Sequence, residues 1–221
     1  MSKKHIVAAG LFGLFSAASQ AEVLNITVTN LTHGIYFTPV ITAAHDANTS
    51  IFHGAEAASA ELQALAEGGD ISGVSGLLSN AGADINENPA GGLLEPANSA
   101  SFSLDTSNKY LSVAAMMLPT NDGFIGLDSW EIPSEAGTYT VFLNAYDAGT
   151  EANDEIIANI PNPIGITSTG ASGVTEEISN TNVHIHPGVI GDADSSGGIS
   201  DLNSSEHRWL NPVAKLTITV E

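Results

Sequence analysis

Two segments, one near each end of the chain, alternate apolar and polar residues with a period of two. Residues 23–30 (VLNITVTN) place three apolar side chains on one face. Residues 213–220 (VAKLTITV) do the same from Lys215 onward, since Val213 is out of phase. A period of two is that of a strand with one buried face. The chain must therefore supply a β-sheet with a core on at least one side.

Further strands are predicted between these two. Residues 110–118 (YLSVAAMML) are almost continuously apolar, which predicts a central strand buried on both faces. Residues 35–42 contain Pro39, which cannot donate to a ladder and indicates an edge strand or a bulge. The remaining candidates are short: 101–104, 138–146 and 182–186.

One segment has a helical rather than a strand period. In residues 59–67 (SAELQALAE), Ser59 is a suitable N-cap and Gly68-Gly69 a suitable end, so we expect a short surface helix. Residues 68–100 are rich in Gly, Asn and Ala, and we expect a loop over the sheet with one helical or turn-like piece around 74–79.

These elements predict an all-β fold: an antiparallel β-sandwich of about seven to eight strands, with one short surface helix and long loops. There is no βαβ rhythm and no internal repeat. Residues 22–221 have the size of one domain. The chain has no cysteine, so its stability must come from core packing, with a bound metal as a further possible source.

The first 21 residues have the three parts of a secretory signal. Lys3 and Lys4 precede an apolar run at 6–15, and small residues lead to Ala21, after which we expect cleavage. The apolar run is half the roughly 20 residues of a membrane-spanning helix. We therefore expect a soluble protein that is secreted or periplasmic.

The mature chain is strongly acidic. All 25 acidic residues follow residue 21, where only three basic residues remain, giving a formal charge of −22. Such a chain repels nucleic acid and anionic membranes. The charge fits a solubilising surface, and some of the carboxylates could also hold cations.

Acidic residues follow two successive strand candidates. Asp122 comes directly after 110–118, and Asp147 and Glu151 come after 138–146. Strands joined by a simple hairpin end at opposite edges, so a shared site requires the intervening residues to cross back. Three converging carboxylates would repel one another and bind a hard cation such as Ca²⁺. The alternative is that these acids cap turns.

The residues in this region resemble the spondin N-terminal (F-spondin) domain, in a bacterial-type single-domain version. Residues 117–127 (MLPTNDGFIGL) and 146–151 (YDAGTE) carry the resemblance, which extends less sharply over most of the mature chain. It implies a β-sandwich and, as in animal matrix proteins, a Ca²⁺ site on Asp122, Asp147 and Glu151. Animal members commonly have Asp at the position of Glu151 and an aromatic residue at that of Gly123, and they use cysteines that are absent here.

Two other groups of residues offer alternative metal sites. The loop 192–203 matches an EF-hand at several positions but has Asn203 where the bidentate Glu belongs. His184 and His186 are spaced to share one face of a strand, and His207 could complete a site for Zn²⁺ or Cu²⁺. The other histidines considered are scattered in predicted turns: His33, His45 and His53.

The function predicted from the sequence is a non-catalytic, calcium-binding adhesion or interaction module of the cell envelope or extracellular matrix. Its partner is an unknown protein or glycan outside the cytoplasm. A histidine-metal envelope enzyme and a purely structural surface protein are the alternatives. Neither a G-x-S-x-G elbow nor a phosphate-binding glycine loop occurs.

Overall fold

The apolar run at 110–118 forms strand β6, which lies inside an antiparallel sheet of ten strands. The structure, a computed structural model, describes residues 21–161, 178–194 and 197–221. The predicted signal peptide lies outside these residues, apart from Ala21. The elements are β1 (Glu22–Asn30), β2 (Tyr36–Phe37), β3 (Ile41–His45), α1 (Ala60–Gly68), α2 (Ser72–Asn80), β4 (Asp84–Glu87), β5 (Ser99–Thr106), β6 (Tyr110–Leu118), β7 (Gly123–Glu131), β8 (Gly137–Asp147), a 3₁₀ turn (Ile157–Asn159), β9 (His184–Ile185) and β10 (Ala214–Val220).

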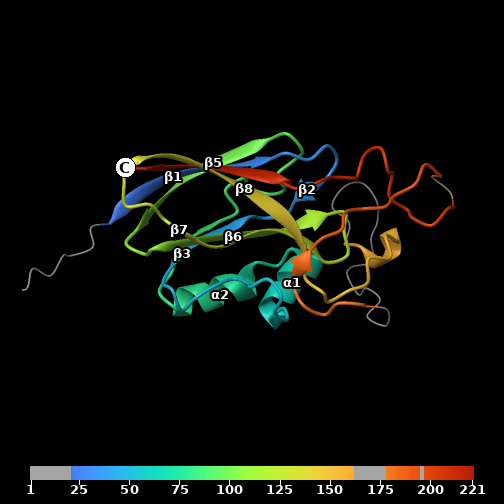
Figure 1. Ribbon diagram of the computed structural model, residues 1–221, viewed down its shortest axis with the longest axis horizontal. Coiled ribbons are helices and arrows are strands. Elements are labelled where there is room, and N and C mark those ends of the chain that lie inside the picture. The colour runs from blue at the N-terminus through green and yellow to red at the C-terminus, as the bar shows by residue number, and fades with distance from the viewer. Residues whose placement is uncertain (1–20, 162–177, 195–196) are drawn as a thin grey trace, which may run out of the picture.

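The strands follow the order β4-β3-β6-β7-β8-β10-β1-β5, with β2 beside β6 and β9 beside β8. Strand β8 belongs to both halves of this path, because residues 137–143 pair with β10 and residues 144–147 pair with β7. The two layers in Figure 1 are therefore one sheet that curls almost into a barrel. The all-β antiparallel prediction is confirmed, but the predicted sandwich is wrong in that its layers are continuous through β8.

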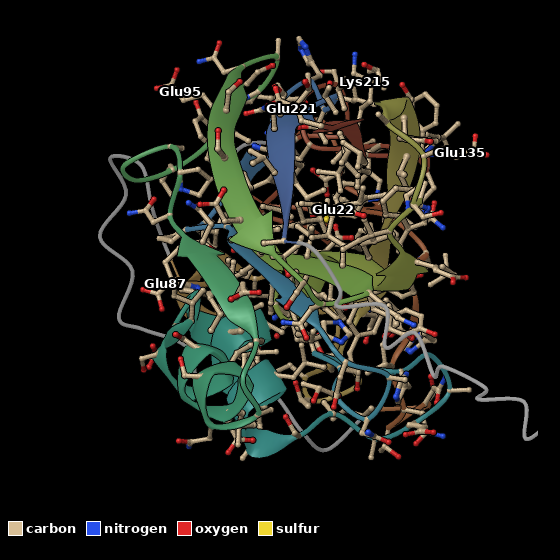
Figure 2. The ribbon with its side chains drawn as sticks, turned by 90° about the vertical axis from the view of Figure 1, so that its left-hand side faces the viewer. Glu22, Glu87, Glu95, Glu135, Lys215 and Glu221 are labelled. Atoms are coloured by element: carbon tan, nitrogen blue, oxygen red, sulfur yellow. The ribbon has the colours of Figure 1, made fainter. Side chains whose placement is uncertain are left out.

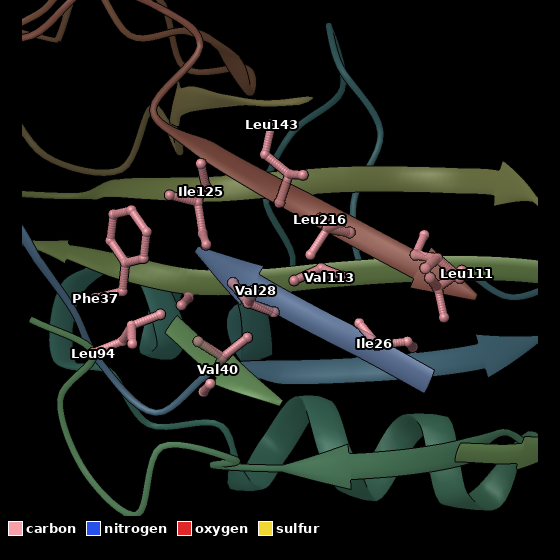
Figure 3. Close-up of a cluster of buried hydrophobic side chains, with 14 of the residues drawn as sticks. Ile26, Val28, Phe37, Val40, Leu94, Leu111, Val113, Ile125, Leu143 and Leu216 are labelled. Atoms are coloured by element: carbon pink, nitrogen blue, oxygen red, sulfur yellow. The ribbon is translucent and has the colours of Figure 1, made fainter. Parts of the chain in front are cut away.

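The interior of the barrel is filled by the alternating faces of the strands (Figure 3). Ile26 and Val28 of β1 and Leu216 of β10 are at most 1% exposed, as their period predicts. They meet Val113 of β6 and Leu143 of β8 in one apolar cluster. Burying each such side chain contributes about 1.5–3 kcal/mol, which is how a chain without disulfides can hold its fold.

Two helices cover the outer face of β3, β6 and β7 (Figure 1). Leu62 and Leu65 of α1 pack with Leu78 of α2 against Ala114 and Phe124 of the sheet. Strand β6 is thus buried on both faces, as predicted. No helix in the described residues is long and apolar enough to cross a membrane.

The predicted helix is confirmed with its caps. The Ser59 side chain accepts a hydrogen bond from the Leu62 amide at 3.1 Å, and Gly69 ends the helix in the left-handed region with φ +67°. The helical piece expected around 74–79 is confirmed as α2, whereas β4 was not predicted within the 68–100 loop. The predicted strand 35–42 divides at Pro39 into β2 and β3, and β3 lies between β4 and β6 rather than at an edge.

Candidate functional site

Strand β7 brings the ends of β6 and β8 to the same edge of the sheet. It runs back from Gly123 between them, antiparallel to both, so both neighbours end where β7 begins. Gly123 is paired with Asp147, and Asp122 precedes it directly. A shared site requires the residues between β6 and β8 to return to the same edge, and they do so as strand β7, which was not among the predicted strands. Asp122 and Asp147 become neighbours through it.

Asp122 is fully buried and holds the loop that follows β8. One of its carboxylate oxygens, Oδ2, accepts hydrogen bonds from the amides of Thr150 at 2.8 Å and Glu151 at 3.0 Å. The other, Oδ1, is buried without a hydrogen-bond partner in the described residues. Burial, together with the nearby charge of Asp147, raises the pKa of Asp122 to about 6.

Asp147 is 2% exposed and lies between two loops. Its Oδ1 accepts from the Gly149 amide at 2.8 Å, and its Oδ2 accepts from the Asn153 side chain at 2.6 Å. The imidazole of His184 approaches Oδ2 with its Nε2 at 3.7 Å. The Nδ1 of that ring is 2.8 Å from the Asn182 carbonyl, so Nδ1 carries a proton there.

Glycine is required at the turn after β8. Gly149 has φ +70°, and a Cβ atom there would lie 2.7 Å from the backbone of Thr181. Gly123 is constrained by packing instead, since a Cβ would lie 2.6 Å from the Thr120 hydroxyl and 3.2 Å from His186. This close packing is the physical reason why a larger side chain is excluded at Gly123.

A further carboxylate, that of Glu155, was missed by sequence reasoning and holds the neighbouring loops. Glu155 accepts hydrogen bonds from the amides of Ile190 at 2.6 Å and Gly191 at 2.8 Å, and from the Ser200 hydroxyl at 2.5 Å. Asn121, also missed, donates to Asp154 at 3.0 Å. Their sequence signal is weak, because polar residues in loops are common and their partners lie 33 to 45 positions away.

His186 lies behind the carboxylates, buried against the ring of Trp209. Its Nδ1 accepts from the Gly188 amide at 2.9 Å, and burial lowers the pKa of the imidazole to about 4. The ring is therefore neutral with its proton on Nε2, which has no hydrogen-bond partner in the described residues. A cavity of about 10 Å³, room for about one water molecule, is lined by Thr120, Asn121, Asn153, Glu155, His186, Val189 and Leu202.

Asp122 and Asp147 lie beside each other, and the Glu151 backbone amide reaches Asp122, but the three carboxylates are not grouped to hold a metal ion in the described residues. Glu151 is 3% exposed, and its amide is bonded to Asp122. Within the described residues, no three His, Asp or Glu side chains are grouped to hold a metal ion. Asp122 and Asp147 nevertheless fit a cation, since one buried oxygen of Asp122 is unpartnered and the two charges disfavour each other.

The alternative metal sites are not assembled in the described residues. His184, His186 and His207 do not form a metal-holding group. Asp192 of the EF-hand-like loop accepts from the backbone amides of Asp194 and Ile199, at 2.8 and 2.9 Å, which is a turn-forming role. Residues 195–196 of that loop lie outside the described residues.

The other histidines differ from one another. His45 is not in a turn as predicted, since it ends β3 and is buried with its Nε2 2.7 Å from the Ser112 hydroxyl. Both side chains of this serine–histidine contact are at most 1% exposed, so a substrate cannot reach it. His53 is exposed and lies 2.9 Å from Asp128, whose hydrogen bond raises the pKa of the imidazole.

Comparison with protein-family models gives a match. The family model described as Spondin_N matches residues 29–164, which is more than half of the chain and contains the turn at Asp122 and the loop with Asp147 and Glu151. No curated protein matches the chain.

Proposed function

The chain belongs to the Spondin_N family, and from this premise we propose that it is an exported, non-catalytic interaction module whose loops are ordered by Ca²⁺. Asp122, Asp147 and Glu151 are the proposed ligands. The proposed partner is a protein or glycan outside the cytoplasm. Membership of a fold family does not identify a ligand, so the proposal depends on the site itself.

One observation carries the calcium proposal. Asp122 is a fully buried carboxylate with one oxygen that has no hydrogen-bond partner among the described residues, and Asp147 lies on the neighbouring strand. Burying a carboxylate costs free energy unless it is paired or coordinates a metal. No lysine or arginine in the described residues makes an ion pair with either acid. A bound cation would supply the missing positive charge.

Calcium is the cation that these groups suit best. It takes six to eight oxygen ligands in irregular geometry, from carboxylates, backbone carbonyls and water. Side chains alone do not complete a site here, so we propose that the Glu151 carboxylate joins Asp122 and Asp147 and that backbone oxygens and water fill the remaining positions. Mg²⁺ demands stricter octahedral geometry and should bind more weakly.

Calcium at this position would stabilise the loops at one end of the barrel. Residues 148–155 contact both acids through Gly149, Thr150, Glu151 and Asn153. Through Glu155 they are linked to the segment around Ile190 and Ser200. An ordered set of loops on a rigid barrel is a common form of binding surface.

The test is thermal unfolding of the purified protein in saturating Ca²⁺ and in chelator. An ion at 100 times its Kd adds about 2.7 kcal/mol to the free energy of unfolding, or roughly 5–10 °C in Tm for a chain of this size. Asp147→Ala should abolish this rise, whereas Asp105→Ala on the exposed face of β5 should keep it.

Four outcomes would count against the proposal. An unchanged Tm in Ca²⁺ and chelator would contradict it, as would wild-type Ca²⁺ affinity in Asp147→Ala. Metal analysis finding Zn²⁺ or Cu²⁺ that is lost in the double variant His184→Ala, His186→Ala would support a histidine-metal enzyme instead. Stability and partner binding that are both indifferent to metal would indicate a structural surface protein.

A further inference from the structure

The barrel has a seam on the side opposite β8 in the strand order. Strands β4 and β5 stand at the two ends of the path, and each is paired on one side only. They meet at one point, where Thr106 and Asn108 donate to Asp84 at 2.7 and 3.1 Å. From there toward Ser99, the described residues supply no strand to the outer edge of β5. Figure 2 views this side, with Glu87 at the end of β4 and Glu95 before β5.

The hydrogen-bond phase shows which backbone groups face outward. The Asn30 amide donates to the Asn98 carbonyl at 3.0 Å, so Asn98 and every second residue after it direct their backbone groups at β1. The intervening residues Ser99, Ser101 and Ser103 must direct their N–H and C=O groups away from β1. No partner for these backbone groups occurs among the described residues.

A groove of about 420 Å³ lies along this edge. One wall is the first half of β5, at Ser99, Ala100 and Ser101. The opposite wall comes from the loop between β4 and β5, where Pro89, Ala90 and Leu93 stand beside the polar residues Glu95 and Asn98. The edge therefore has space beside it for the side chains of an added strand, with a lining that is more polar than apolar.

The edge also lacks the usual protection against pairing. Natural edge strands carry lysine, proline or a bulge, or are covered. Residues 99–104 (SASFSL) contain no charge and no proline, and they pair with β1 in unbroken register. The first charge along the strand is Asp105.

We propose that the outer edge of β5 is a β-augmentation site that accepts an extended, basic segment of a partner protein. The segment would add as a strand at Ser99–Ser103 and place alternate side chains in the groove. Main-chain hydrogen bonds would give affinity, and the groove would give specificity. Such a segment spans about five residues, or about 17 Å.

Charge decides between the two possible occupants. The groove and its surroundings contribute carboxylates, Glu87, Glu95 and Asp105, and the mature chain has only three basic residues. A second copy of this chain, which has 25 acidic residues against 5 basic ones, would carry the same sign of charge and be repelled. A segment that alternates lysine with valine is complementary in both charge and backbone.

The test uses a labelled peptide, acetyl-(Lys-Val)₄-amide, and fluorescence anisotropy in 0.15 and 0.5 M NaCl. A matched peptide carries N-methyl groups on alternate residues, which keep every charge and side chain but remove donors to the edge. We expect the N-methylated peptide to bind about tenfold or more weakly at both salt concentrations, because it loses two or more main-chain hydrogen bonds.

Ser101→Pro tests the edge from the protein side. The Ser101 N–H points away from β1, so proline at that position removes no ladder hydrogen bond and the fold should be kept. It removes an outward donor, and we expect about tenfold weaker binding of the unmodified peptide. Ser101→Ala keeps the N–H, loses only the exposed hydroxyl contact with Thr27, and should bind as the wild type does.

The peptide comparison needs no variant, so it stands even if Ser101→Pro fails to fold, which circular dichroism would reveal. Equal binding of both peptides would overturn the proposal, because attraction would then be electrostatic alone. Absence of binding by either peptide would overturn it too. Self-association that disappears in Ser101→Pro would replace the basic segment with a second copy as the occupant.

Discussion

At the scale of single residues, the most informative feature is a buried carboxylate that no lysine or arginine pairs with in the described part of the chain. Asp122 is 0% exposed, and within that part of the chain only one of its oxygens accepts hydrogen bonds, from the amides of Thr150 and Glu151. A purely structural role would be filled as well by an asparagine, which is neutral. Retaining a carboxylate there costs stability in the cation-free protein.

The first prediction concerns Asp122→Asn. The raised pKa of Asp122 means that the fold favours the protonated acid. The destabilisation caused by the ionised carboxylate is therefore absent below about pH 4 and complete above about pH 6. At pH 7 in chelator the variant should therefore be more stable than the wild type, by about 1–3 kcal/mol. Urea unfolding measures this.

The same variant should lose the stabilisation by Ca²⁺. Loss of the response to Ca²⁺ distinguishes a cation site from a turn cap, because asparagine keeps an accepting oxygen for the two amides and differs only in its charge. Asp105→Asn on β5, which is exposed, should leave both measurements unchanged. Lower stability of Asp122→Asn in chelator would contradict the interpretation.

The pair His53 and Asp128 gives a prediction about pH. The hydrogen bond that the His53 imidazole donates to Asp128 raises the pKa of His53, so the protonated imidazole is favoured in the folded state. Its contribution to stability is present below the ordinary pKa of about 6.5 and is lost as the pH rises through the folded value. The His53 side chain is 48% exposed, so the effect on stability should be small.

NMR titration of the imidazole measures the shift directly. Asp128→Asn should lower the pKa of His53 toward its ordinary value, while the conservative change Asp128→Glu should retain most of the elevation. An unchanged titration in Asp128→Asn would show that the pair does not form in solution.

At the scale of elements, one buried side chain links two loops. The Glu155 carboxylate joins the segment after β8 to residues 190–200, and Asp201 bonds the Ile157 amide at 2.9 Å. These loops contain little regular secondary structure, so side chains rather than ladders fix their positions. These loops are therefore stabilised by their own side-chain contacts, separately from the strands of the barrel.

We predict that Glu155→Gln loosens these loops without unfolding the barrel. Glutamine keeps one accepting oxygen, but its NH2 group cannot accept from an N–H or O–H, so at least one of the bonds to Ile190, Gly191 and Ser200 is lost, at about 1–3 kcal/mol for a buried group. Hydrogen exchange should become about 5- to 100-fold faster in residues 188–194, with β6 unchanged. Glu56→Gln, an exposed control, should change neither, and uniform acceleration would contradict a local role.

At the scale of the whole molecule, residues 22–221 combine 25 acidic and three basic residues, a formal charge of −22, with no cysteine. The core is held by packing, while surface carboxylates repel one another. Screening is weak at low ionic strength, where the Debye length is about 30 Å at 0.01 M, and strong at 1 M, where it is about 3 Å. Stability should therefore depend on salt.

We predict that Tm in chelator rises by roughly 3–8 °C between 0.01 and 0.5 M NaCl, corresponding to about 1–2 kcal/mol. KCl should give the same rise, because screening does not distinguish the two cations. A flat response would show that the carboxylates are too well separated to destabilise the fold, and a rise in one salt alone would indicate specific ion binding.

Sequence periodicity was sufficient to predict the elements in which residue spacing alone shows which side chains are buried. The strands β1 and β10, the two-sided burial of β6 and the capped helix α1 follow from spacing and end residues, because backbone geometry fixes which side chains share a face. The acids at Asp122, Asp147 and Glu151 were identified from their positions after strands, and the family from the motifs around them.

Only the tertiary structure decided how these elements close. Strand β7 (GFIGLDSWE) has no clean period, because its two halves have different neighbours, and β8 pairs first with β10 and then with β7. Contacts such as that of Glu155 with Ser200 join residues 45 positions apart. A barrel with an open edge at β5, rather than a sandwich, results from pairings between distant strands, which no local pattern encodes.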